Sequence, residues 1–191
     1  MDRMDESDAA VVAQVRAGDS GAFRVLVERH SRPVFRLAFR LTGNQQDAED
    51  VVQETFLRAF GRLNRFEARA GFGTWLHRIA VNCAMDVLRK RPRAHLLASL
   101  DDQASAGAAD TPDEGAIGPE RRAESAEIRR SLNQALDVLT PAERAAFVLR
   151  HFEGRSLEEI GRELGLRTSA TKHSIFRAVQ KMRRALEPLV T

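Results

Sequence analysis

The sequence has a single cysteine, Cys83, among 191 residues. One cysteine cannot form a disulfide within the chain, and it cannot build a cysteine-based metal site. The five histidines are scattered without the close spacing of metal ligands, and neither a glycine-rich phosphate loop nor a nucleophile elbow is present. We therefore expect no metal, no cofactor and no catalytic centre, and we expect Cys83 to be a buried, unreactive thiol on an apolar helix stripe.

Long apolar runs are missing as well. No run approaches the ~18 residues that a membrane span requires, and the acidic residues 1–8 do not have the pattern of a signal peptide. We expect no membrane insertion and a soluble, cytoplasmic protein. The formal net charge is only +3 although 30% of the residues are charged, so the distribution of charge says more about partners than the total does.

The composition divides the chain into three parts. Residues 8–93 and 125–187 are rich in helix-forming residues with apolar side chains at helical spacing, and no strand-like alternation of useful length occurs. Residues 94–124 contain seven acidic and two basic residues in an Ala-, Ser-, Gly-, Asp- and Pro-rich context, which predicts a flexible acidic linker. The sequence therefore predicts an all-α protein of two small helical domains joined by this linker.

Capping patterns predict where helices begin and end. In the first domain we predict five helices, at 8–17, 19–29, 31–42, 45–62 and 74–91. Asn44 is the predicted N-cap of the fourth and Thr74 that of the fifth. In the second domain, Thr140 and Ser156 each have a glutamate three residues later, which is the capping-box pattern.

Residues 156–184 have the pattern of a helix-turn-helix. Gly165 can end the first helix in a left-handed conformation, and Thr168 or Ser169 can cap the second. Six basic residues and no acidic one lie between Arg167 and Arg184. A helical hairpin with a solvated basic face is one interpretation, but this acid-free run favours a recognition helix that enters a DNA major groove.

Three segments of the first domain carry candidate functional residues. The helix that begins near Asp47 has a crowded acidic side, either a solvated face or a docking surface for a basic partner. The next helix has a polar stripe and a basic end, which either complements the helix dipole or binds nucleic acid. The segment 65–72 mixes arginines with aromatics, as in sites for single-stranded bases, although a mobile polar loop would look similar.

These segments together resemble a known family. The acidic helix 47–56, the segment 72–82 with Asp86 and Arg89, and the third set at 139–149 and 156–184 follow one another as in the extracytoplasmic-function (ECF) group of bacterial RNA polymerase sigma factors, of the sigma-70 family. The resemblance covers roughly residues 15–93 and 130–187. It implies that 8–93 is the sigma region two helical bundle and that 125–187 is the sigma region four domain.

The resemblance implies a sigma factor that directs core RNA polymerase to promoters and has no catalytic activity of its own. It implies as partners the β′ clamp helices and the β flap of the polymerase, promoter DNA and an anti-sigma factor. The implied polymerase-binding residues are Asp47, Glu49, Asp50, Gln53 and Glu54. The implied contacts with the downstream (−10) element are Arg65, Phe66, Phe72, Arg78, Asn82, Asp86, Arg89 and Lys90. The implied contacts with the upstream (−35) element are Arg167, Ser169, Lys172, His173, Phe176, Arg177 and Lys181.

The chain departs from the family pattern at the start of the recognition helix. His173 and Ser174 stand where Ser-Arg is usual, so the preferred upstream sequence is open. The alternative function is an autonomous helix-turn-helix regulator with 8–93 as a sensor or dimerisation domain. An acidic docking helix beside a basic, aromatic segment favours the sigma factor, because a sensor needs a ligand pocket or a dimer seam instead.

Overall fold

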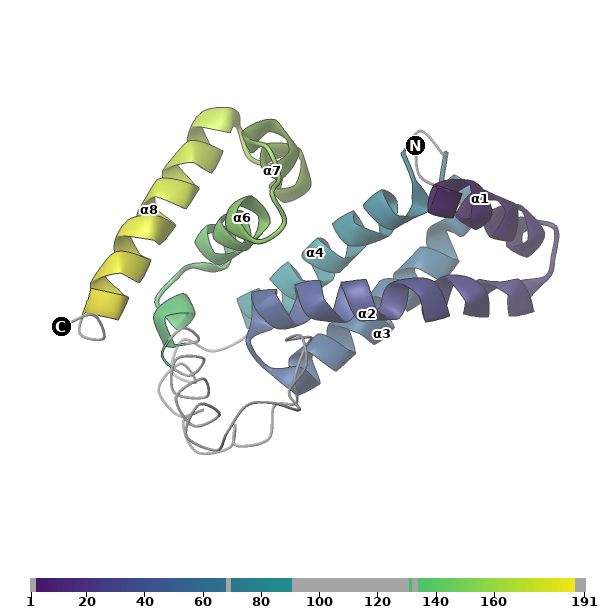
Figure 1. Cartoon of the computed structure of the whole chain (residues 1–191), viewed down its shortest axis with the longest axis horizontal. Coiled ribbons are helices and arrows are strands. Elements are labelled where there is room, and N and C mark those ends of the chain that lie inside the picture. The colour runs from purple at the N-terminus through teal and green to yellow at the C-terminus, as the bar shows by residue number, and fades with distance from the viewer. Residues whose placement is uncertain (1–2, 68–69, 91–130, 132–133, 188–191) are drawn as a thin grey trace. The chain divides into compact units, whose positions relative to one another are not determined.

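A computed structural model describes residues 3–67, 70–90, 131 and 134–187 (Figure 1). All regular elements within these ranges are helices, as the sequence predicts. The chain forms two compact units, Met1–Leu88 and Arg89–Thr191, and each is described by itself. The predicted linker 94–124 lies outside the described residues.

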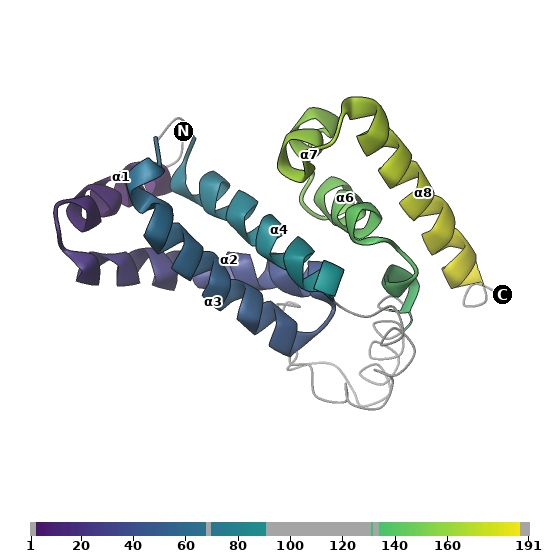
Figure 2. The same cartoon turned by 180° about the vertical axis from the view of Figure 1, so that it is seen from behind.

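The first unit is built around two long helices, α2 and α3, which lie side by side (Figure 2). Its elements are α1 (Arg3–Arg16), η1 (Ser20–Ala22), α2 (Phe23–Thr42), α3 (Gln45–Arg62), η2 (Leu63–Arg65) and α4 (Phe72–Lys90). Gly43 has a φ of 68° and turns the chain between α2 and α3. Asn44 then caps α3 by accepting a hydrogen bond from the Asp47 N–H at 2.9 Å, which confirms the predicted cap.

The prediction of separate helices at 19–29 and 31–42 is wrong, because α2 continues through Pro33. Proline removes one backbone hydrogen bond and costs a helix about 3 kcal/mol, and Pro33 lies on the exposed side. The buried stripe of α2 includes Leu26, Val34, Leu37 and Leu41 on both sides of the proline. Each such side chain contributes about 1.5–3 kcal/mol on burial, so packing of the continuous helix outweighs the proline.

Helix α4 begins earlier than predicted, at Phe72, so Thr74 lies inside its first turn and is not its N-cap. The reason is tertiary packing. Phe72 is only 2% exposed, and its burial extends the helix to two residues before Thr74. Further along α4, Cys83 is buried as predicted. Burial also raises the pKa of its thiol, although a hydrogen bond with Thr55 opposes that shift.

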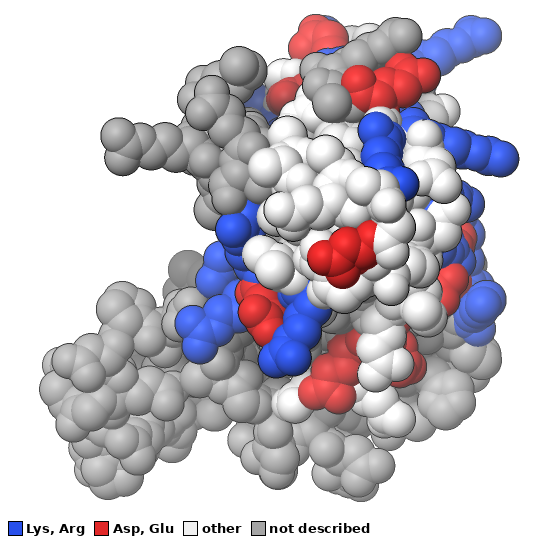
Figure 3. Space-filling model, turned by 90° about the vertical axis from the view of Figure 1, so that its right-hand side faces the viewer, with Lys and Arg blue, Asp and Glu red and all other residues white. Residues whose placement is uncertain are grey.

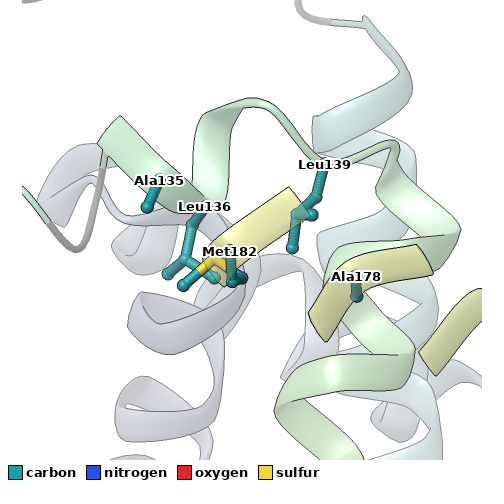
Figure 4. Packing of buried hydrophobic residues seen from close by; sticks show 5 residues of the cluster. All are labelled: Ala135, Leu136, Leu139, Ala178 and Met182. Carbon is teal, nitrogen blue, oxygen red and sulfur yellow. The ribbon is translucent and has the colours of Figure 1, made fainter. Parts of the chain in front are cut away.

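The second unit contains α6 (Pro141–His151), α7 (Leu157–Leu164) and α8 (Thr168–Leu186) after a helical stretch at 134–137. Side chains from that stretch, from the turn after it and from α8 form one apolar cluster, drawn in Figure 4: Ala135, Leu136, Leu139, Ala178 and Met182. Both predicted capping boxes are present, at Thr140 with Glu143 and at Ser156 with Glu159. In the part of the chain that the structure describes, no helix is long and apolar enough to cross a membrane.

Candidate functional site

The outer side of α3 carries the predicted acidic face. Glu49, Asp50 and Gln53 are exposed, whereas Asp47 and Glu54 are partly buried. The charge of the first turn suits the positive end of the helix dipole. Asp50 and Gln53, however, lie further along the helix on its exposed side, where a charged surface is open to a partner.

The acidic face continues into an apolar surface that the sequence analysis missed. Leu57 is 69% exposed and Phe60 is 48% exposed. These two residues continue a series with Asp50 and Gln53 in which the spacings are three, four and three residues, so all four lie on one side of α3. An exposed apolar patch beside charged residues is typical of a protein–protein contact. The helical spacing of the two residues was the sequence signal that could have identified them.

Arg58 connects this helix to α4. Its Nε donates to Glu54 at 2.5 Å and its Nη1 donates to Asp86 at 3.1 Å. These two hydrogen bonds raise the pKa of Arg58, so the guanidinium stays charged. Asp86, predicted to face DNA, therefore already contacts Arg58, and the predicted docking face and the predicted DNA stripe share one ion-pair network.

The other polar residues predicted to contact the −10 element are on the surface. Arg78, Asn82 and Arg89 are exposed along α4, and Lys90 is exposed in its last turn. Arg65 is exposed at the end of η2. The residues of the predicted basic cluster beyond Lys90 lie outside the described ranges.

The two predicted aromatic contacts, Phe66 and Phe72, are instead buried, at 6% and 2% exposure. Their rings lie edge to face with centroids 5.9 Å apart, and both rings contact Trp75, at 5.2 Å and 5.7 Å. Aromatic pairs in this arrangement stabilise a core. In this structure neither phenylalanine is open to a base, and both support the connection between α3 and α4 from within.

The helix-turn-helix has the predicted turn. Gly165 ends α7 with a φ of 66°, and a Cβ on Gly161 would lie 2.8 Å from the Leu166 carbonyl oxygen. Position 161 therefore has no room for a side chain. The predicted N-cap of α8 is wrong: the cap is Arg167, without a side-chain hydrogen bond, and Thr168 is already helical. The Thr171 hydroxyl, from within α8, donates to the Arg167 carbonyl oxygen at 3.1 Å and Thr171 is fully buried, so packing places the helix start.

One side of α8 presents most of the residues predicted to contact the −35 element. Six of them are exposed: Arg167, Ser169, Lys172, His173, Phe176 and Arg177. Phe176 is 62% exposed, which is costly for a phenylalanine without a partner. The Nδ1 of His173 lies 3.2 Å from the Ser169 carbonyl oxygen. A carbonyl oxygen only accepts, so Nδ1 carries the proton and Nε2 is left as an acceptor when the ring is neutral.

Lys181 is the exception on this helix. Its ammonium donates to Glu143 of α6 at 2.6 Å, and Glu143 is only 5% exposed. Burial alone would raise the pKa of Glu143, but the hydrogen bonds from Lys181 and from the Thr140 N–H lower it overall. In this structure Lys181 holds α8 against α6.

Basic residues run along α8 without acidic ones, whereas the face shown in Figure 3 mixes both signs. On the face that Figure 3 shows, lysines and arginines lie among acidic residues around an uncharged area. From Arg167 to Arg184, by contrast, α8 carries basic residues and no acidic one. Such a one-sign surface is the electrostatic footprint of a nucleic-acid-binding helix.

Within the described ranges, no group of three or more His, Cys, Asp or Glu residues could hold a metal ion.

Comparisons with known proteins agree with this geometry. The family model of sigma-70 region 2 matches residues 26–94, and the model of sigma-70, region 4 matches residues 129–182. The chain is 40% identical to the ECF RNA polymerase sigma factor SigE of Mycolicibacterium smegmatis over 158 residues, which are 83% of this chain and 59% of SigE. It is 33% identical to the RNA polymerase sigma-H factor of Pseudomonas aeruginosa over 97% of this chain and 96% of that protein. The solved structure of CnrH in complex with the cytosolic domain of CnrY aligns with a TM-score of 0.59 and 28% identity, covering 94% of this chain and 96% of CnrH.

Proposed function

The chain belongs to the ECF group of the sigma-70 family of RNA polymerase sigma factors, and from this premise we propose how its residues divide the work of transcription initiation. A sigma factor binds core RNA polymerase and directs it to promoters, so this chain needs a docking surface and two DNA-binding surfaces. The polymerase supplies the chemistry, and the chain itself acts without catalysis and without a cofactor. Its place of action is the cytoplasm, where core polymerase and promoter DNA are found.

The docking surface is the outer side of α3. Asp50 and Gln53 supply polar contacts with the β′ clamp helices, and Leu57 and Phe60 supply apolar area beside them. Charged groups at an interface steer association and fix its register, whereas most of the affinity comes from apolar and aromatic anchors that lose water on binding. Such an α3 surface explains why Leu57 and Phe60 are left exposed in the free protein.

The −10 surface combines α4 with the connection between α3 and α4. Arg65, Arg78 and Asn82 are open to the DNA backbone and to an unpaired base. Opening the duplex costs a few kcal/mol per unstacked base, and part of that cost is recovered when a protein surface binds the flipped base. Phe66 and Phe72 contribute from the core of the domain, because their packing fixes the two ends of the connection.

The −35 surface is the exposed side of α8, which enters the major groove of duplex DNA. Lys172 and Arg177 contact phosphates or guanine edges, and Phe176 packs on a thymine methyl group. The neutral His173 ring offers an acceptor at Nε2, which suits the amino group of adenine or cytosine. With this assignment, His173, which stands where the family usually has serine, helps to select the upstream sequence.

Two further partners follow from the family. The second domain binds the β flap of the polymerase, which places α8 over the upstream element. An anti-sigma protein holds the chain inactive by covering these surfaces. The complex of CnrH with the cytosolic domain of CnrY supports a protein partner of this kind.

The observation that carries the proposal is the juxtaposition of exposed acidic and apolar residues on α3, which an autonomous regulator would not need. Asp50→Lys reverses one exposed charge on that face. Its affinity for core RNA polymerase is expected to fall at least about 10-fold, equivalent to 1.4 kcal/mol, in a titration with fluorescently labelled protein.

The matched control is Glu28→Lys, the same type of reversal on α2, where Glu28 pairs with the exposed Arg24 at 2.7 Å. It is expected to bind core polymerase like the wild type, and both variants are expected to keep the wild-type melting temperature within the few degrees of a surface change. Equal affinities of Asp50→Lys and wild type would remove α3 as the docking surface.

A further inference from the structure

Helix α1 contacts the start of the connection between α3 and α4 directly, and it contacts the end of that connection through His30 of α2. At one end, Arg16 donates from Nε at 3.2 Å and from Nη2 at 2.7 Å to the carbonyl oxygen of Leu63. The same Nη2 also donates to the carbonyl oxygen of Phe66. Leu63 is the C-cap of α3 and the first residue of η2, and Phe66 follows η2, so one guanidinium holds both ends of this short helix.

The other end is supported through a buried charge network. Asp8 of α1 is 1% exposed, and its carboxylate accepts from Arg29 Nη1 at 2.9 Å and lies 2.7 Å from His30 Nε2. The His30 ring in turn lies 5.3 Å from the ring of Phe72. A Cβ on Gly73 would lie 3.3 Å from the His30 ring, so the start of α4 rests directly on this histidine.

Net stability is a weak explanation for the buried charge network of Asp8, Arg29 and His30. A buried ion pair is at best a weak source of net stability, since desolvation offsets most of the attraction. What such networks can supply is one fixed geometry. The region 2 match begins at residue 26, so α1 lies before the matched residues.

We propose that α1 is a clamp that fixes the start of the α3–α4 connection, residues 63–67, for −10 recognition, with Arg16 as its positioning residue. The inference rests on the proposed function, because it assigns the connection to the capture of an unpaired base. Arg16 need not touch DNA. It fixes the carbonyls of Leu63 and Phe66, and thereby the direction in which Arg65 between them faces the strand.

The test compares Arg16→Ala and Arg16→Lys in the full chain, each bound to core RNA polymerase on a promoter recovered from genomic fragments. The control is Arg24→Ala, which removes an exposed arginine whose partner is Glu28 on its own helix. Strand opening is measured by permanganate reactivity of −10 thymines, and base preference is measured by selection from a library randomised in the −10 element.

Arg16→Ala is expected to slow opening at least 10-fold and to broaden the preference at the captured base, with unchanged affinity for core polymerase and for duplex −35 DNA. Arg16→Lys keeps the charge without the two-carbonyl fork and is expected to fall between Arg16→Ala and wild type. Arg24→Ala is expected to match wild type. Amide hydrogen exchange at Phe66 and Phe72 is expected to accelerate in Arg16→Ala alone.

Unchanged opening and unchanged base preference in both Arg16 variants would overturn the clamp, even if their melting temperatures fell. If Arg16→Ala does not fold, Arg16→Lys decides by the same two measurements. If the wild-type protein and core polymerase open no promoter at all, the proposed function fails and the clamp fails with it, whereas a functional wild type with indifferent Arg16 variants refutes only the clamp.

Discussion

The turn that leads into the recognition helix α8 is set by residues close to it in the sequence, whereas the connection between α3 and α4 is held by a residue far from it. The helix-turn-helix depends on the Ser156–Glu159 capping box, on Gly165 in the left-handed region and on the close approach of Gly161 to Leu166. The α3–α4 connection depends on Arg16, which is 47 and 50 positions from its two carbonyl partners.

This difference matches what each surface has to do. Reading duplex DNA requires a rigid helix at a fixed angle, which local capping and turn geometry can define. Capturing a base from an opened strand requires a loop, and a loop takes a defined shape only when other elements hold it. The first domain therefore combines contacts from α1, α2 and α4 around one connection, whereas the turn before α8 is set by residues of the helix-turn-helix itself.

The largest expected effect is on the local arrangement of the second domain. Gly161→Ala would place a methyl group 2.8 Å from the Leu166 carbonyl oxygen and 3.2 Å from the Thr171 hydroxyl, so the turn has to move. We expect a loss of about 3 kcal/mol in the unfolding free energy of this domain, measured by urea denaturation, with a parallel loss of duplex binding.

Gly61→Ala is the matched control, because nothing lies within 4 Å of a Cβ at that position of α3. Alanine is expected to stabilise this helix by about 0.5–1 kcal/mol. If both substitutions changed the unfolding free energy in the same direction, the tight turn would not be what positions α8.

The next effect separates recognition from folding. Arg177→Ala is expected to weaken binding to duplex −35 DNA by about 2 kcal/mol, with little change in stability because Arg177 is exposed. Fluorescence anisotropy with a duplex probe measures it. Arg184→Ala, on an exposed position in the last turn of the same helix, is expected to lose less, and equal losses would mean that the recognition side is assigned wrongly.

The smallest effect concerns the ion pair between Lys181 of α8 and Glu143 of α6. The folded pKa of Glu143 is lowered, so its contribution is complete above the ordinary carboxyl pKa and disappears as the pH falls from that value through the folded pKa. Glu143→Gln is expected to remove this acid dependence of the second domain's unfolding free energy. Glu158→Gln, at an exposed position of α7, should keep it, and an unchanged pH profile in Glu143→Gln would contradict the assignment.

Local patterns made much of the fold predictable. Thr140 and Ser156 were recognisable caps because each has a glutamate three residues later, and Gly165 was recognisable because few other residues accept its conformation. Apolar residues at helical spacing are buried as that pattern indicates, among them Val51 and Ala59 on α3 and Ala178 and Met182 on α8.

The misses share a cause, which is packing between distant residues. Pro33 reads as a break in the sequence, yet the stripe on both sides of it is buried in one helix. Phe66 and Phe72 read as surface aromatics beside arginines, but they pack on Trp75 and His30 instead. No local pattern reveals that Arg58 binds Asp86 or that Lys181 binds Glu143, since each pair is formed by two helices.

The most direct test is run-off transcription with purified core RNA polymerase, this protein and a pool of promoter fragments from the source genome. The account predicts transcripts that depend on the protein, start downstream of a shared two-element sequence and decrease with Asp50→Lys. The contradicting result is an absence of transcripts and of association with core polymerase while duplex DNA binding stays intact, which would identify an autonomous DNA-binding regulator.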